Sequence, residues 1–323
     1  MRKIAFIYFN LFAVVYASAQ SFTFDPSNQD IGYTPRAFTF GNQEQIIISG
    51  EMQYYRVDPA EWEDRLLKMK GALVNCVSSY IPWGLHEPQK GAFDYQGFKD
   101  VFLFNQMADS LGLYSILKPS GYICNEFTGG GFPAWLWAEE GWPRTADPAF
   151  LAAIDRWLEN IIPQLNPYQI TEGGNMIFCQ LENEYSKGNK PYLLHYRDKV
   201  RQLGMNIPLV NNGGKDLGHP GTIPTYDLYL KPMPESLLNR DWSRSNSQPT
   251  EGKPRFSSEY ESGWLNTEYS NMETQMGHIS GEWLKTLAAL AYYQGDAGLN
   301  YYMFCGGTDR GMNASKKFPN SYF

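Results

Sequence analysis

Hydrophobic and polar positions along the chain follow two different periods. Short apolar runs rich in β-branched and aromatic residues, which are typical of buried strands, alternate with longer runs in which apolar residues recur every three or four positions. Eight strands are predicted, at residues 45–50, 72–80, 113–120, 176–183, 207–212, 225–230, 254–260 and 298–304. Five amphipathic helices are predicted between them, at residues 59–71, 97–112, 148–162, 192–204 and 281–295.

This alternation favours an α/β fold, and eight repeats of strand and helix predict a (β/α)8 TIM barrel rather than an open sheet. The helix between the sixth and seventh strands is poorly marked, because residues 231–253 are polar and contain proline. We interpret that segment as a long βα loop. In a barrel of this kind the loops that follow the strands build the active site.

The N-terminus has the composition of an export signal. Arg2 and Lys3 precede an apolar stretch at residues 4–16, and Ala17-Ser18-Ala19 is a small-x-small cleavage site. We therefore expect residues 1–19 to be a signal peptide cut after Ala19, residues 20–40 to be a leader, and the mature protein to be secreted or periplasmic. The alternative is a membrane anchor, which would need a longer apolar span.

Composition narrows the choice of partner. A net charge of −7 and a pI near 5.2, without a basic run, argue against nucleic acid or an anionic membrane, so a neutral substrate is expected. Nine Trp and 22 Tyr suit a protein that binds sugars, although most rings in any chain are core. The four cysteines are far apart, no zinc motif accompanies the four histidines, and we expect free thiols and neither metal nor cofactor.

Candidate catalytic residues are expected where the predicted strands end. These positions hold Arg56, Tyr80, Asn183, Glu184, Asn211, Asn212, Glu259 and Thr308. A barrel would place Glu184, at strand four, across one pocket from Glu259, at strand seven. Two such acids are what glycoside hydrolysis requires: one protonates the leaving oxygen, and the other attacks the anomeric carbon or, at a wider separation, activates water. The alternative for either acid alone is a salt bridge, and for the two asparagines a turn.

Six blocks in order along the chain resemble the catalytic domain of glycoside hydrolase family 35, the β-galactosidases. They are SGEMQYYRVDPAEWEDRLLKMK, NCVSSYIPWGLHEPQKGAFDYQG, LGLYSILKPSGYICNEFTGGGFPAWL, NMIFCQLENEYSKG, FSSEYESGWLN and YYMFCGGTD. The resemblance covers residues 41–323. It implies a retaining exo-β-glycosidase that releases terminal non-reducing β-D-galactose from an oligosaccharide or glycan.

The resemblance also assigns roles to residues. Glu184 would be the general acid/base, Glu259 the nucleophile, and Asn183 the ligand of the sugar 2-hydroxyl. The residues that would hold the other hydroxyls are Tyr80, Cys124, Asn125 and Glu126. Asn125 and Glu126 could instead form a loop cap, and Trp135 and Trp264 could be sugar platforms or loop core. Glu182 is expected to form an ion pair inside the barrel, with Arg56 as one candidate partner.

The chain departs from the family pattern at several positions. Gln53 stands where the opening motif usually has His, and Glu261 adds an acid two residues after Glu259. These departures predict a donor or linkage preference that differs from that of a generalist lactase. Family members continue into β-rich accessory domains that this chain is expected to lack. Alternative functions are an exo-β-glycosidase of another specificity, such as a β-glucosaminidase, and a non-catalytic carbohydrate-binding relic of the fold.

Overall fold

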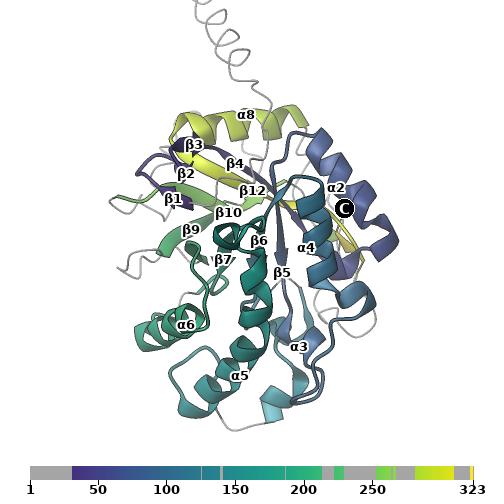
Figure 1. Ribbon diagram of the computed structural model, residues 1–323, viewed down its shortest axis with the longest axis vertical. Helices are drawn as coiled ribbons and strands as arrows, with labels where there is room; N and C mark the ends of the chain where they lie inside the picture. Colours follow the sequence, from purple (N-terminus) through teal and green to yellow (C-terminus); the bar gives the residue numbers. More distant parts are fainter. Residues whose placement is uncertain are drawn as a thin grey trace, which may run out of the picture.

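A closed barrel of eight parallel strands forms the centre of the protein (Figure 1). The computed structural model describes residues 31–124, 126–138, 141–185, 187–212, 222–228, 252–262, 265–266, 281–308 and 321–322. The barrel strands are β4 (Ile47–Met52), β5 (Cys76–Tyr80), β6 (Tyr114–Lys118), β7 (Met176–Gln180), β8 (Leu209–Asn212), β9 (Thr222–Leu228), β10 (Arg255–Glu261) and β12 (Asp296–Cys305). They neighbour one another in chain order, and β12 pairs with β4 to close the barrel. The predicted (β/α)8 fold is confirmed.

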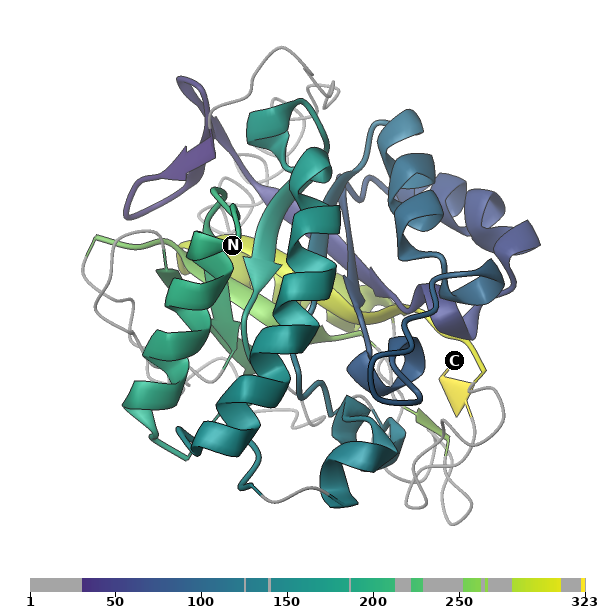
Figure 2. The same cartoon turned by 60° about the horizontal axis from the view of Figure 1, so that its bottom comes forward.

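Helices cover the outside of the barrel (Figure 2). They are α2 (Trp62–Gly71), α3 (Trp83–His86), α4 (Val101–Ser110), α5 (Pro148–Leu165), α6 (Lys190–Gln202) and α8 (Gly281–Tyr293). Local sequence explains where the longest begins, because the Asp147 side chain accepts hydrogen bonds from the backbone N–H groups of Ala149 and Phe150. The apolar face of α5, which includes Trp157 and Ile161, is fully buried against the barrel. The five predicted helices are confirmed to within a few residues at each end.

Short elements complete the connections. The 3-10 helices are η1 (Tyr54–Arg56), η2 (Pro59–Glu61), η3 (Gly97–Lys99), η4 (Thr128–Gly131), η5 (Ala134–Ala138), η6 (Asn166–Tyr168) and η7 (Ile170–Glu172). Two further strands, β11 (Leu265–Asn266) and β13 (Ser321–Tyr322), form an antiparallel pair. Within the described ranges, none of the helices combines the length and apolarity needed to cross a bilayer.

A small antiparallel sheet precedes the barrel. It consists of β1 (Ile31–Tyr33), β2 (Phe38–Phe40) and β3 (Gln43–Gln45). Phe38 is fully buried, and its ring centroid lies 4.7 Å from that of Phe178 on β7 and 5.9 Å from that of Phe256 on β10. The expectation that residues 20–40 are a leader is therefore wrong for residues 31–40, which pack against the barrel. The predicted signal peptide, residues 1–19, lies outside the described residues.

The interior of the barrel carries polar side chains. Glu51, Ser78, Lys118, Gln180 and Asn300, each on a different barrel strand, are all at most 1% exposed. Barrel interiors are commonly filled by bulky branched residues. Buried polar groups usually have hydrogen-bond partners. Lys118 and Asn300 both bind Glu51 here, under the strand ends where catalytic side chains are expected.

Candidate active site

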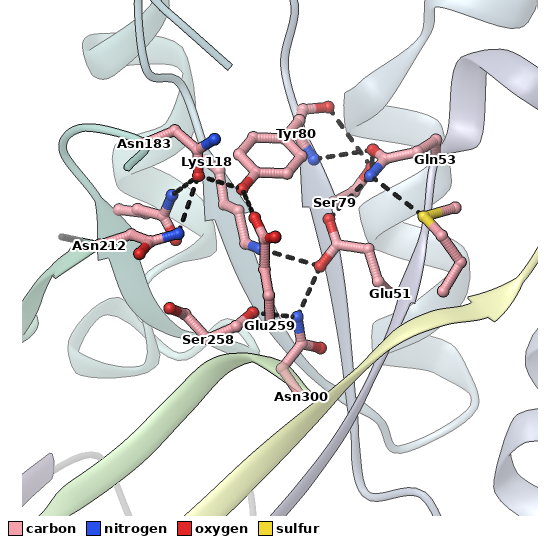
Figure 3. Close-up of polar contacts among 12 residues, drawn as sticks. Glu51, Gln53, Ser79, Tyr80, Lys118, Asn183, Asn212, Ser258, Glu259 and Asn300 are labelled. Atoms are coloured by element: carbon pink, nitrogen blue, oxygen red, sulfur yellow. Dashed lines mark hydrogen bonds and ion pairs between the residues drawn. The ribbon is translucent and has the colours of Figure 1, made fainter. Parts of the chain in front are cut away.

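Glu259, the predicted nucleophile, is buried near the end of β10. The residue is 4% exposed, and the Tyr80 hydroxyl donates a hydrogen bond of 2.7 Å to Glu259 Oε1 (Figure 3). The register of β10 shifts against both neighbouring strands between Ser257 and Tyr260. Irregularities of this kind are frequent next to active sites because they redirect a side chain. Glu259 therefore lies at an irregularity in the pairing of β10 with its neighbouring strands.

Glu184, the predicted acid/base, lies four residues beyond the end of β7. Its φ of +46° is left-handed, which is uncommon for a residue other than glycine. The backbone therefore leaves the extended conformation here, as expected from the end of the strand. The Glu184 side chain is exposed at the rim, yet the surrounding protein raises the pKa of its carboxyl by desolvation, while the charge of Arg144 lowers it. A raised pKa suits a group that must carry a proton near neutral pH.

Asn183 and Tyr80 join the strands that carry the two acids (Figure 3). The Tyr80 hydroxyl lies 2.6 Å from Asn183 Oδ1 as well as 2.7 Å from Glu259 Oε1, and Asn212 Nδ2 donates to Asn183 Oδ1 at 2.9 Å. Asn183 Nδ2 donates to the Ile123 carbonyl at 3.1 Å. These contacts orient the Asn183 amide. The Tyr80 hydroxyl has a single proton for two acceptors, so its hydrogen bond can follow the charge on Glu259.

Lys118 and Glu51 form a buried ion pair below Glu259 (Figure 3). We call this pair, together with Asn300, the floor of the site. Lys118 Nζ lies 2.9 Å from Glu51 Oε2 and 4.3 Å from the centroid of the Tyr80 ring. Asn300 Nδ2 donates both to Glu51 Oε2, at 2.7 Å, and to the carbonyl of Ser258, at 2.8 Å. The residue that precedes Glu259 is thus tied to the ion pair (Figure 3).

Gln53 extends this floor toward Tyr80. Its Nε2 donates to Glu51 Oε1 at 2.8 Å, and its Oε1 accepts from the backbone N–H of Tyr80 at 3.0 Å. Gln53 is fully buried. Glu51, Lys118 and Asn300 were not among the predicted site residues. Lys118 and Asn300 lie inside the predicted strands 113–120 and 298–304, and Glu51 directly follows the predicted strand 45–50. A lysine inside a buried strand, at the end of LYSILK, was the signal that could have revealed the pair.

The loop after β6 lies near the two predicted catalytic acids. Cys124 and Glu126 are both half-buried and both have left-handed φ values, of +53° and +48°. Desolvation raises the pKa of the Cys124 thiol, and the negative charges of Glu126, Glu184 and Glu259 act in the same direction. Cys124 therefore lies close enough to Glu126 and to both predicted catalytic acids for their charges to act on its thiol. Asn125, the other residue predicted from this loop, lies outside the described residues.

The family of the chain follows from comparison with known proteins. The profile described as glycosyl hydrolases family 35 matches residues 37–323. The chain belongs to this family. It is 35% identical over 269 residues to the "Beta-galactosidase-1-like protein" of Mus musculus, covering 82% of this chain and 41% of that protein. It is 35% identical over 292 residues to the "Beta-galactosidase" of Mus musculus, covering 86% of this chain and 43% of that protein. The chain thus spans less than half the length of these two curated relatives.

A solved structure supports the fold alone. The exo-beta-1,4-mannosidase from Opitutaceae bacterium strain TAV5 superposes with a TM-score of 0.64 at 13% identity, covering 85% of this chain and 55% of that one.

This family 35 barrel has a third carboxyl beside the two predicted catalytic acids that was not predicted from the sequence. Asp227 on β9 is the register partner of Glu259, and Ser258 Oγ donates to Asp227 Oδ1 at 3.2 Å. The pKa of Asp227 is raised well above its usual range by desolvation and by the charges of Glu259 and Glu184. The predicted sixth strand, residues 225–230, continued past Asp227, so the search of strand ends did not reach it.

Tyr302 on β12 is a second residue that the sequence analysis missed. Desolvation raises the pKa of this buried tyrosine, and the charges of Glu126 and Glu259 raise it further. Tyr302 is therefore close enough to Glu126 and Glu259 for their charges to act on its hydroxyl. Within the part of the chain that the structure describes, no group of three or more His, Cys, Asp or Glu side chains is placed to hold a metal ion.

Several predicted rim residues have other places in this family 35 barrel. Arg56 and Thr308 line a cavity of about 410 Å³ next to η2, together with residues of that turn. The turn interpretation of Asn211 and Asn212 is wrong, because both lie on β8 and Asn212 binds Asn183. The partner of Glu182 is Arg144, which makes two hydrogen bonds of 3.0 Å to its carboxylate, and not Arg56.

Trp135 belongs to the loop core rather than to a sugar platform. Its Nε1 donates to the Glu87 carbonyl at 2.9 Å, and the Arg156 guanidinium lies 4.9 Å from its ring centroid. Trp264 lies outside the described residues. All four cysteines are free, as expected, but only Cys76 and Cys179 are fully buried.

Proposed function

We propose that this chain is the catalytic barrel of a retaining exo-β-galactosidase that hydrolyses terminal β-D-galactose residues of oligosaccharides or glycans. The observation that carries the proposal is the pair of carboxyls at the ends of β7 and β10, Glu184 and Glu259, joined through Asn183 and Tyr80. The names of the family 35 relatives support galactose as the donor sugar.

In the proposed first step Glu259 attacks the anomeric carbon while Glu184 donates a proton to the departing oxygen. The buried position of Glu259 keeps water away from the attacking oxygen, and Tyr80 holds that carboxylate in place. As negative charge leaves Glu259, the Tyr80 proton can turn to Asn183 Oδ1, 2.6 Å away. In the second step Glu184, now a carboxylate, takes a proton from water, which attacks the anomeric carbon and releases Glu259.

The first experiment is a substrate panel. Nitrophenyl β-glycosides of galactose, glucose, N-acetylglucosamine and mannose should show turnover concentrated on the galactoside, and proton NMR of early product should show the β-anomer. Turnover concentrated on another sugar would identify an exo-β-glycosidase of different specificity. Initial release of the α-anomer would refute retention.

The second experiment assigns the two acids. With azide present, Glu259→Ala should form α-galactosyl azide and Glu184→Ala β-galactosyl azide, because each variant leaves a gap on one face of the sugar. Glu172→Ala is the matched control, since Glu172 is an exposed acid on η7, before the start of β7. An intact protein that binds galactose but turns over no glycoside would overturn the enzyme proposal in favour of a binding protein.

We also propose that the protein is exported after cleavage behind Ala19. The supporting observation is the order of basic, apolar and small residues in residues 2–19. N-terminal sequencing of protein recovered from the medium or periplasm should begin at Gln20. An intact N-terminus on membrane-bound protein would favour an anchor instead.

A further inference from the structure

Arg144 holds the chain segment that ends in Glu184. It lies in the loop before α5, with a side chain 12% exposed, and its Nε and Nη2 atoms donate to the two oxygens of Glu182 at 3.0 Å each. Nη2 also donates to the carbonyl of Asn183 at 2.5 Å. A guanidinium with two parallel bonds to a carboxylate is a geometrically specific contact. Arg144 therefore fixes both residues that immediately precede Glu184.

The residue that follows Glu184 is held by the same arginine. The Tyr185 hydroxyl donates to the Arg144 carbonyl at 2.9 Å, and the guanidinium lies 5.1 Å from the Tyr185 ring centroid. On its other side the guanidinium lies 3.9 Å from the ring centroid of Tyr122, which belongs to the loop after β6. Glu182 and Asn183 before Glu184, Tyr185 after it, and the loop after β6 thus all contact Arg144.

Glu182 completes the arrangement from within. It is fully buried, its Oε1 accepts from the Tyr192 hydroxyl at 2.8 Å, and its Oε2 accepts from the backbone N–H of Asn183 at 2.8 Å. We name Arg144 and Glu182 the clamp. The clamp spans the residues on either side of a left-handed backbone, at Glu184, that an L-residue rarely adopts. A strained conformation persists only where its surroundings determine it.

The clamp also carries charge. Arg144 neutralises the buried carboxylate of Glu182, and its positive charge favours the ionised form of Glu184. No mechanistic step assigned above uses Arg144.

We propose that Arg144 is a positioning residue for the acid/base Glu184: through the clamp it imposes the backbone turn that aims the Glu184 carboxyl at the leaving oxygen. This inference rests on the proposed glycosidase function. Its consequence is selective in kcat/KM, which reports the first step, because a misaimed acid slows that step only where the leaving oxygen needs a proton. The second step, in which Glu184 acts as the base, affects kcat alone.

The test compares substrates with different leaving groups. For Arg144→Lys, kcat/KM on methyl β-galactoside or lactose should fall about 30- to 100-fold, because a misplaced acid loses much of its contribution. On 2,4-dinitrophenyl β-galactoside, whose leaving group departs without protonation, the loss should be within about 3-fold. Equal losses on both kinds of substrate, or no loss on either, would overturn the inference.

The pH profile separates position from charge. Arg144→Met combined with Glu182→Gln removes both charges of the clamp, so it leaves no buried charge unpaired and is expected to fold. Without the cation the pKa of Glu184 rises, and the alkaline limb of kcat/KM should move to higher pH, while the loss that depends on the leaving group remains. A limb that stays in place together with uniform losses would indicate a merely structural role and refute the proposal.

Arg156→Gln is the matched control. Arg156 on α5 also pairs with a buried acid, Glu87, at 3.4 Å, but it does not contact the segment after β7. It should show neither effect. If the intact protein turns over no galactoside at all, the proposed function fails and the inference about Arg144 falls with it; if the intact protein is active and Arg144→Lys behaves like Arg156→Gln, only the inference fails.

Discussion

The ion pair between Lys118 and Glu51 allows a quantitative test of the barrel interior. Lys118→Met removes the cation but keeps a side chain of similar length. Glu51, fully buried, would then retain, among the residues that the structure describes, the amide donors Gln53 Nε2 and Asn300 Nδ2, at 2.8 and 2.7 Å. Removing one member of a buried pair costs about 3 to 5 kcal/mol. Because two hydrogen bonds to Glu51 remain, we expect the lower end of that range.

The corresponding shift in melting temperature can be estimated. At about 2.1 cal/mol/K per residue, roughly 290 barrel residues have an unfolding entropy of about 0.6 kcal/mol/K. A loss of about 3 kcal/mol then lowers the melting temperature by about 5 °C. The assay is urea unfolding followed by tryptophan fluorescence, with thermal scans as a second measurement.

A double-mutant cycle isolates the pair itself. Glu51→Gln combined with Lys118→Met leaves no charge in the floor, so the double variant should be more stable than Lys118→Met by about 2 kcal/mol. Lys68→Met is the control, because Lys68 and Asp64 form an exposed pair, with side chains 63% and 56% accessible, and such pairs contribute less than about 1 kcal/mol. A Lys118→Met loss below about 1 kcal/mol, or a double variant less stable than the single one, would refute the reasoning.

Three further predictions concern single residues. Tyr80→Phe removes the donor to Glu259 and should lower kcat on galactosides by about 10- to 100-fold with the fold intact by circular dichroism; an unchanged kcat would contradict a role for that hydroxyl. Asp227→Asn resembles the protonated acid and should keep kcat/KM within about 3-fold at pH 6 to 7, whereas Asp227→Leu should not; equal losses would show that the charged form is needed. Burial lowers the pKa of His86 to about 4, so the folded state keeps it neutral. Because the unfolded chain protonates this histidine first, the free energy of unfolding should be unaffected by His86 above about pH 6.5 and should fall by up to about 3 kcal/mol toward pH 4. His86→Gln should reduce that fall when urea unfolding is measured across this pH range. An unchanged fall would assign the acid sensitivity to other groups.

The barrel could be predicted because its strands are repeated, apolar and locally encoded. Each of the eight strands lies within a few residues of its predicted position, since an apolar run bounded by polar residues needs no long-range information. The strands β1 and β2 were not predicted. They have three residues each, too few for a period to appear, and they are held by contacts such as Phe38 with Phe178 and Phe256, which lie far away in the sequence.

Only the site residues at the strand ends could be predicted from the sequence. Glu184, Glu259, Tyr80 and Asn183 stand at strand ends, where the barrel topology alone brings residues together. The remaining contacts join side chains that no sequence pattern predicts to be close. Lys118 and Glu51 are 67 residues apart in the sequence, and Asn300 and Glu51 are 249 apart. A buried charge is tolerated only with its partner, so each of these residues is explicable once the pair is seen.

Gln53 connects the buried ion pair to Tyr80 through both ends of its amide. The amide has one donor and one acceptor end, and the structure uses both, toward Glu51 and toward the backbone N–H of Tyr80. Since Gln53 is fully buried and accepts from the backbone N–H of Tyr80, we expect it to affect a bound sugar through the position of the Tyr80 hydroxyl. That hydroxyl contacts both Asn183 and Glu259, the groups proposed to hold the 2-hydroxyl and to attack the anomeric carbon. A substitution in the floor is therefore expected to change the rate of the chemical step before it changes which sugar is bound.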